Sequence, residues 1–262
     1  MLAHATGFHG RVFLPLAEHL REHFHCISFD LRGHGDSGAR PDRDFAWQFF
    51  ALDVLAVVDE VAGDHPLGLG HSCGGAALLL AEEARPGTFS QLYCFEPVVL
   101  PSDDPPPVDP SNHMSEAARR RREVFSSRSA ALANYASKPP MTQFDDDTLR
   151  AYVEFGFDDL DDGTVRLKCR RDDEALVYQH GARHSAYAGL GGVRCPVTLA
   201  CGAGNGNGTG TGTFSPAILE LLAQRLPDGR VEVFDDLGHF GPLERPGEIA
   251  ASVVRATDPA RA

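Results

Sequence analysis

The chain has 262 residues and carries 37 acidic against 24 basic side chains, a net charge of −13. Such a surplus of negative charge argues against nucleic acid or an anionic membrane as a partner. No apolar run reaches the roughly 18 residues that a membrane span needs, and no basic segment leads into an apolar signal stretch. We therefore expect a cytoplasmic protein with a small-molecule partner; the sequence does not indicate an oligomeric state.

Short apolar runs bounded by turn residues predict strands at residues 1–5, 25–29, 66–70, 91–96, 196–201 and 230–234. Between them, apolar residues at helical spacing predict helices at 12–23, 47–62, 75–84 and 216–225. This alternation predicts an α/β fold, a mostly parallel, doubly wound sheet with helices on both faces. Six cysteines without Cys-x-x-Cys spacing are expected to be free, buried thiols.

The interval from residue 101 to 192 breaks the alternation with a Pro- and Asp-rich stretch followed by charged, helix-like segments. We expect a helical cap inserted after the strand that ends at Glu96, between core segments 1–100 and 193–262. Most of its large apolar residues are expected to pack the cap itself, although any of them could line a pocket. The run Arg119–Arg122 is expected to be a solvated helix face.

Residues 70–74 read Gly-His-Ser-Cys-Gly, directly after a predicted strand and before a predicted helix. This is the pattern of a nucleophile elbow, a sharp turn that raises a serine hydroxyl above the sheet edge. Glycine is favoured at residues 70 and 74 because these two positions come very close to adjacent backbone and glycine has no Cβ. The following helix points its first N–H groups toward an oxyanion, so the Cys73 N–H is expected to be one donor.

Four motifs, in the right order, resemble those of the α/β-hydrolase superfamily. They are the loop 4–10 (His-Ala-Thr-Gly-Phe-His-Gly), the turn 29–38 (Phe-Asp-Leu-Arg-Gly-His-Gly-Asp-Ser-Gly), the elbow, and the segment 237–246 (Leu-Gly-His-Phe-Gly-Pro-Leu-Glu-Arg-Pro). The resemblance implies an α/β-hydrolase fold with Ser72 as nucleophile, His239 as base and Phe8 N–H as the second oxyanion donor. Relative to that fold, we expect the N-terminal edge strands to be missing, which means either a shorter sheet or a late start codon.

The third triad member departs from the family pattern. Most relatives carry an Asp shortly after the strand that here spans residues 196–201, and this chain has Asn205 there. Some relatives carry the acid one strand earlier, where this chain has Glu96, a carboxylate that is costly to bury without a partner. Glu96 is therefore the expected acid, with Asn205 as a neutral orienting alternative and Asp103 or Asp235 as further ones.

We predict a serine hydrolase that needs no cofactor and cleaves a small or medium carboxylic ester or lactone, a substrate class that rests on fold-level analogy. Carbon–carbon bond hydrolysis, thioester cleavage and perhydrolysis use similar residues and remain alternatives. A non-catalytic ligand-binding relative is the alternative from another class. No metal is expected, because His19 and His23 spell a zinc-peptidase pattern only on the polar face of a helix, and His180 and His184 lack a third ligand.

Overall fold

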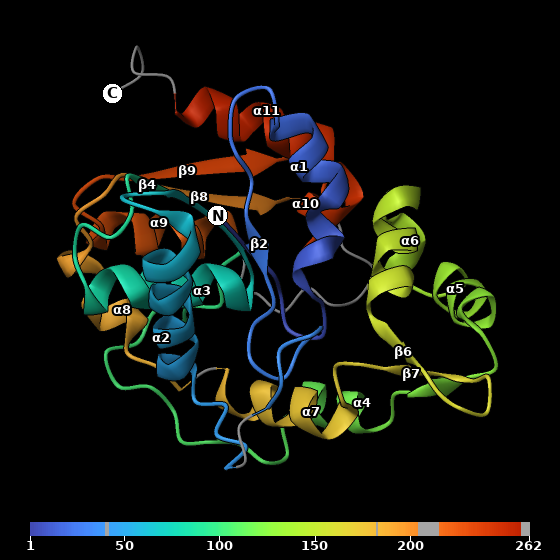
Figure 1. Ribbon diagram of the computed structural model, residues 1–262. Helices are drawn as coiled ribbons and strands as arrows, with labels where there is room; N and C mark the ends of the chain where they lie inside the picture. Colours follow the sequence, from blue (N-terminus) through green and yellow to red (C-terminus); the bar gives the residue numbers. More distant parts are fainter. Residues whose placement is uncertain (40–41, 182, 204–214, 258–262) are drawn as a thin grey trace.

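The computed structural model describes residues 1–39, 42–181, 183–203 and 215–257 (Figure 1). Its central sheet has six parallel strands in the order β2-β1-β3-β4-β8-β9. They are β1 (Leu2–Ala3), β2 (Ser28–Phe29), β3 (Leu67–His71), β4 (Gln91–Phe95), β8 (Val197–Gly202) and β9 (Gly229–Phe234). All six strands lie at the predicted places, and the expected α/β fold is confirmed.

Helices cover both faces of the sheet (Figure 1). One face carries α2 (Trp47–Val57), α3 (Cys73–Ala84), α8 (Ala186–Gly189) and α9 (Pro216–Arg225). The other carries α1 (Leu14–Leu20), α10 (Gly241–Glu244) and α11 (Pro246–Ala256). Each layer buries an apolar cluster against the sheet, which is how a doubly wound fold keeps both sheet faces dry.

Strand β4 contributes side chains to the apolar clusters on both faces of the sheet. Its side chains alternate between the faces, so Leu92 and Cys94 join the cluster under α3 while Tyr93 and Phe95 join the cluster under α11. All four are fully buried. A strand buried on both faces reads as an unbroken apolar run, and for this reason its position was predictable.

Two predicted helices have different boundaries in the structure. Residues 12–23 divide into a 3-10 turn η1 (Gly10–Phe13) and α1, whose second residue is Pro15. Residues 47–62 form α2 and then a π-helical turn η2 (Val58–Ala62). In both cases the apolar periodicity runs across a change of helix type, because periodicity alone does not distinguish neighbouring helix types.

Among its described residues, the segment between β4 and β8 holds five helices and a small antiparallel sheet. The helices are α4 (His113–Arg119), α5 (Arg128–Ala136), α6 (Asp146–Phe155), α7 (Arg171–His180) and α8, with 3-10 turns η3 (Met141–Gln143) and η4 (Leu190–Gly192). The sheet has the order β5-β7-β6 and consists of β5 (Val124–Phe125), β7 (Val165–Leu167) and β6 (Phe157–Asp159). Only helices were expected here, since strands of two or three residues carry no readable alternation.

The two parts of this segment lie in different places in the fold. Helices α4 to α7 and the small sheet gather at one end of the molecule, beside the loops that follow β1 and β9 (Figure 1). Residues 186–192 return to the main sheet, where Ala186 and Leu190 are buried in the cluster beneath α3. No described helix has the length and apolarity to span a bilayer, and all six cysteines are free thiols, five of them buried.

Candidate active site

Ser72 occupies the turn between β3 and α3 with φ 55° and ψ −116°. A side chain at positive φ is strained, and such strain persists only where the surroundings hold it. Here the Ser72 N–H donates to Phe95 O at 2.9 Å, and the Val98 N–H donates to Ser72 O at 3.2 Å, so the elbow is fastened to the end of β4. A Cβ on Gly74 would lie 2.2 Å from Ala3 O, which explains the glycine there.

Glu96 and His239 are in direct contact. His239 Nδ1 lies 2.5 Å from Glu96 Oε2, and Glu96 Oε1 accepts a hydrogen bond from the Gly202 N–H at 3.0 Å. The Glu96 side chain is only 4% exposed, and its backbone has φ 44°. Both carboxylate oxygens therefore have partners, and the strained backbone aims the carboxylate across β8 toward the loop after β9.

The two other carboxylates considered for the acid have different surroundings. Asp103 forms a bidentate ion pair with Arg225 on the surface, with N–O distances of 2.6 and 2.8 Å. The Asp235 side chain is exposed. Asn205 lies outside the described residues. Of the four residues considered, Glu96 is the one that the described structure places against His239.

His71, the residue before the serine, also contacts the His239 loop. Its Nε2 lies 2.8 Å from His239 O, and because that atom is a carbonyl, Nε2 carries the proton and donates it. Burial and the neighbouring His239 keep the pKa of His71 well below its ordinary value, so the ring is neutral. Its Nδ1 is buried without a hydrogen-bond partner among the described residues. Its position next to Ser72 was visible in the sequence, but its contact with the His239 loop was not.

The two expected oxyanion donors lie in the loop after β1 and at the start of α3. Cys73 is the first residue of α3, where an N–H has no acceptor inside the helix. The Phe8 N–H makes a 3.2 Å turn contact with Ala5 O, which also lies 2.7 Å from His4 Nδ1. His4 Nε2 accepts from the Leu31 N–H at 3.0 Å, so Nδ1 is the donor to Ala5 O.

The thiol beside the serine is not a competing nucleophile. Cys73 is fully buried, and burial raises the pKa of its thiol to about 12. A thiol is a nucleophile only when ionised, so Cys73 stays inert at neutral pH.

A cavity of about 540 Å³ lies between the loop after β1 and the inserted helices. Phe8 and Phe240 form its inner wall, with ring centroids 5.7 Å apart, and Phe240 in turn packs edge-on against His239 at 4.9 Å. The outer wall comes from α4, α5, α6 and α7. Ser72 is 7% exposed and is not among the residues that line this cavity.

Of the large apolar side chains in the insertion, some face this cavity. Phe125, Tyr135, Met141 and Tyr152 are among its lining residues. Arg121 also reaches it, and here the expectation of a solvated arginine face was wrong. The Arg121 side chain is 20% exposed, forms a short ion pair with Glu174 and donates to Tyr152 Oη at 2.5 Å. A run of four arginines carries no periodicity that could have singled out one of them.

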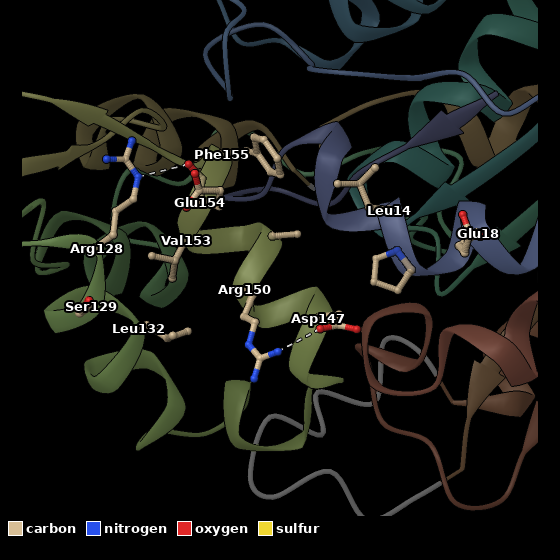
Figure 2. Close-up of a pocket in the computed structure, with 12 residues that line it drawn as sticks. Leu14, Glu18, Arg128, Ser129, Leu132, Asp147, Arg150, Val153, Glu154 and Phe155 are labelled. Carbon is tan, nitrogen blue, oxygen red and sulfur yellow. Dashed lines mark hydrogen bonds and ion pairs between the residues drawn. The ribbon is translucent and has the colours of Figure 1, made fainter.

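A second cavity of about 600 Å³ lies outside the active-site region, between α1 and helices α5 and α6. In Figure 2, Leu14 and Glu18 lie on α1, beside α6, and a dashed line joins Arg150 to Asp147 on α6. That contact measures 3.2 Å. None of its lining residues belongs to the loops that carry Ser72, Glu96 or His239. It is therefore not the place where these groups meet a ligand. Within the described part of the chain, no three His, Cys, Asp or Glu side chains gather as a metal site.

Comparison with known proteins gives consistent results. The model of the family described as "Alpha/beta hydrolase family" matches residues 1–252. Monoglyceride lipase of Mus musculus is 34% identical over 105 residues, which cover 38% of this chain and 34% of the lipase, about a third of its length. The crystal structure of the peroxisomal α/β-hydrolase Lpx1 from Saccharomyces cerevisiae superimposes with TM-score 0.79 at 22% identity, over 97% of this chain and 74% of Lpx1. E-2-(acetamidomethylene)succinate hydrolase gives 0.77 at 22% identity, over 97% and 89%.

Proposed function

Since the chain belongs to the α/β-hydrolase family, we propose that it is a serine hydrolase that cleaves a small or medium carboxylic ester or lactone through an acyl-enzyme on Ser72. The observation that carries the proposal is the 2.5 Å contact between His239 Nδ1 and Glu96 Oε2. Through this contact, Glu96 provides the carboxylate that most relatives carry as an Asp shortly after the strand equivalent to β8, where this sequence has Asn205. The segment similar to a monoglyceride lipase, although short, favours an ester among the possible acyl substrates.

In the proposed reaction, Ser72 Oγ attacks the ester carbonyl while His239 Nε2 takes the proton of the Ser72 hydroxyl. Glu96 holds Nδ1–H, which fixes the tautomer and stabilises the imidazolium that forms. The N–H groups of Cys73 and Phe8 stabilise the oxyanion of the tetrahedral intermediate. For Phe8, this requires its weak turn contact with Ala5 O to give way to the substrate oxygen.

Collapse of that intermediate expels the alcohol, which receives its proton from His239 Nε2, and leaves an ester on Ser72. A water molecule then gives a proton to His239 and attacks the acyl carbonyl, and the second collapse returns the proton to Ser72 and releases the acid. No metal or organic cofactor takes part in these steps.

The test is to label the protein with a fluorophosphonate probe beside a Ser72→Ala variant, and then to assay p-nitrophenyl esters of increasing acyl length. We expect labelling and turnover that both depend on Ser72. Absence of labelling in the wild-type protein would refute the serine-hydrolase proposal. Labelling without turnover of any ester would instead point to a different electrophile for the same nucleophile.

A further inference from the structure

The walls of the 540 Å³ cavity carry charge of the opposite sign to the chain as a whole. Its charged lining residues in the described structure are Arg120, Arg121, Arg122 and Lys138 against a single acid, Glu174. The chain itself has a net charge of −13. A cleft lined by one sign of charge and walled by apolar side chains focuses its field on a bound ligand. The cavity is thus electrostatically suited to an anion.

Arg121 organises the polar part of this wall. It is one of the least exposed basic side chains in the described structure, at 20%, and its charge is paired with the buried Glu174. Its Nη2 donates to two phenol oxygens, Tyr152 Oη at 2.5 Å and Tyr135 Oη at 3.3 Å. An arginine can only donate, so each phenol must act as acceptor toward it.

The consequence concerns the phenol protons. A phenol oxygen that accepts from Arg121 still has its own O–H to donate. Because Tyr135 and Tyr152 share one guanidinium nitrogen, their two O–H groups lie close together, and both residues line the cavity. Two adjacent donors match the two oxygens of a carboxylate, and hydrogen bonds to a charged acceptor are stronger than neutral ones.

This polar cluster lies against the loop that carries an expected oxyanion donor. A Cβ placed on Gly7 would lie 2.5 Å from Glu174 Oε1 and 3.2 Å from Arg121 Nη1. Phe8 is the next residue, and its ring lies 5.3 Å from that of Tyr152. A ligand held by the two phenols is therefore beside the loop where an acyl carbonyl is expected to sit.

From this arrangement we infer that the substrate is an ester with a free carboxylate, whose charge is bound by the O–H groups of Tyr135 and Tyr152 in the field of Arg120, Arg122 and Lys138. The inference rests on the proposed function for the ester, but the carboxylate site can be measured without turnover. The other three cations each have a partner. Arg120 lies 3.7 Å from Glu116, and the Arg122 guanidinium lies over the ring of Phe125. Lys138 Nζ lies 2.7 Å from Asn134 Oδ1. Of these partners only Glu116 is charged, so most of the positive field remains.

The direct experiment is calorimetric titration of the Ser72→Ala protein with monomethyl succinate and, separately, with uncharged dimethyl succinate. We expect the monoanion to bind about tenfold more tightly or better, as for hydrogen bonds to a charged group, and to lose affinity as ionic strength rises. Monomethyl glutarate and monomethyl adipate extend the series and find the best spacing between ester and carboxylate. Equal or tighter binding of dimethyl succinate would overturn the inference.

Variants locate the site. Tyr135→Phe and Tyr152→Phe, each in the Ser72→Ala background, remove one O–H and keep the ring, and each is expected to weaken binding of the monoanion by about tenfold. Arg121→Met alone would strand the buried Glu174, so it is paired with Glu174→Gln. Arg150→Gln in the same background is the control, because it removes a surface cation on α6 that lines the second cavity, shown in Figure 2. This variant should bind the monoanion as tightly as the Ser72→Ala parent does. If both Tyr→Phe variants bind as tightly as the parent, the assignment is wrong.

The two proposals can fail independently. The wild-type protein is assayed with p-nitrophenyl hydrogen succinate and with p-nitrophenyl butyrate, which has a similar length and no charge. Ser72-dependent turnover of both without preference for the anion refutes the carboxylate site and leaves the serine hydrolase intact. Binding of monomethyl succinate by a protein that shows neither fluorophosphonate labelling nor Ser72-dependent turnover refutes the hydrolase and leaves the anion site intact.

Discussion

His71 Nε2 lies 2.8 Å from the backbone carbonyl oxygen of His239. The residue that precedes the expected nucleophile thus holds the loop that carries the expected base, across a sequence separation of 168 residues. Because burial keeps the His71 ring neutral, its Nε2–H stays available as a donor to this carbonyl at neutral pH.

His71→Phe should therefore lower kcat by about 10- to 100-fold, since small misplacements of a catalytic group are costly. His71→Gln, which retains an N–H donor, should recover part of the loss. Both variants should keep the pH at which the acidic limb of the kcat/KM profile falls, because His71 positions the base and does not exchange protons with substrate. A kcat of His71→Phe equal to that of the wild type would show that the His239 loop needs no such support.

Glu96→Gln should lower kcat/KM by about 10²- to 10⁴-fold, as expected when an imidazole loses the carboxylate that fixes its tautomer and balances its charge. The amide oxygen can still accept from Gly202 N–H, so the fold should survive. Asp103→Asn is the matched control: it removes a carboxylate whose partner is Arg225 on the surface, and its kcat/KM should be that of the wild type. The reverse ranking of the two variants would remove Glu96 from the triad.

Gly202→Ala tests the close approach between β8 and the His239 loop. A Cβ at residue 202 would lie 2.0 Å from Leu237 O, so the loop must shift. Overpacking of this kind costs about 1–3 kcal/mol of unfolding free energy, and it should also reduce activity. Gly192→Ala is the control, because nothing lies within 4 Å of the position that its Cβ would take. Thermal unfolding of both variants measures the difference, and equal Tm values would contradict the prediction.

His184 makes the stability depend on pH. It stacks on Trp47 at 5.2 Å and its Nε2 donates to Val98 O at 2.8 Å, while burial lowers its pKa from 6.5 to about 4. Between these two values the unfolded chain binds a proton that the folded protein does not. Its contribution to stability is therefore complete above pH 6.5 and is lost as the pH falls toward 4.

Between pH 7 and pH 5 this single group should remove about 1–2 kcal/mol of unfolding free energy. Buried His4, His34 and His71, whose pKa values are lowered by burial, act in the same direction. Urea unfolding at both pH values measures the loss, which should be smaller in His184→Gln than in the wild type. A parallel fall in both proteins would contradict the assignment.

The sequence was sufficient to predict the central sheet, because each of its strands is a short apolar run followed by a turn. The sequence also pointed to Glu96 as a buried carboxylate that requires a partner, and the structure places that carboxylate against His239; its role as the acid stays a prediction. Its contact with His239 joins residues 143 positions apart, and only the β4–β8 pairing brings them together.

The inserted segment was harder to predict. Its strands are two or three residues long, and the role of Arg121 depends on α7, which supplies Glu174 from 53 positions further along the chain. Nothing local in Arg119–Arg122 distinguishes the one side chain that turns inward. Residue 205, an alternative for the acid, lies outside the described residues, so the prediction for Asn205 remains untested.

Ser72, Glu96 and His239 follow strands of the main sheet, whereas Arg121, Tyr135 and Tyr152 all come from the segment between β4 and β8. The residues of the proposed reaction and those of the proposed selectivity therefore lie in separate stretches of the sequence. For protein engineering, this means that a library confined to residues 114–178 can explore new substrates while the residues proposed to break the bond stay constant.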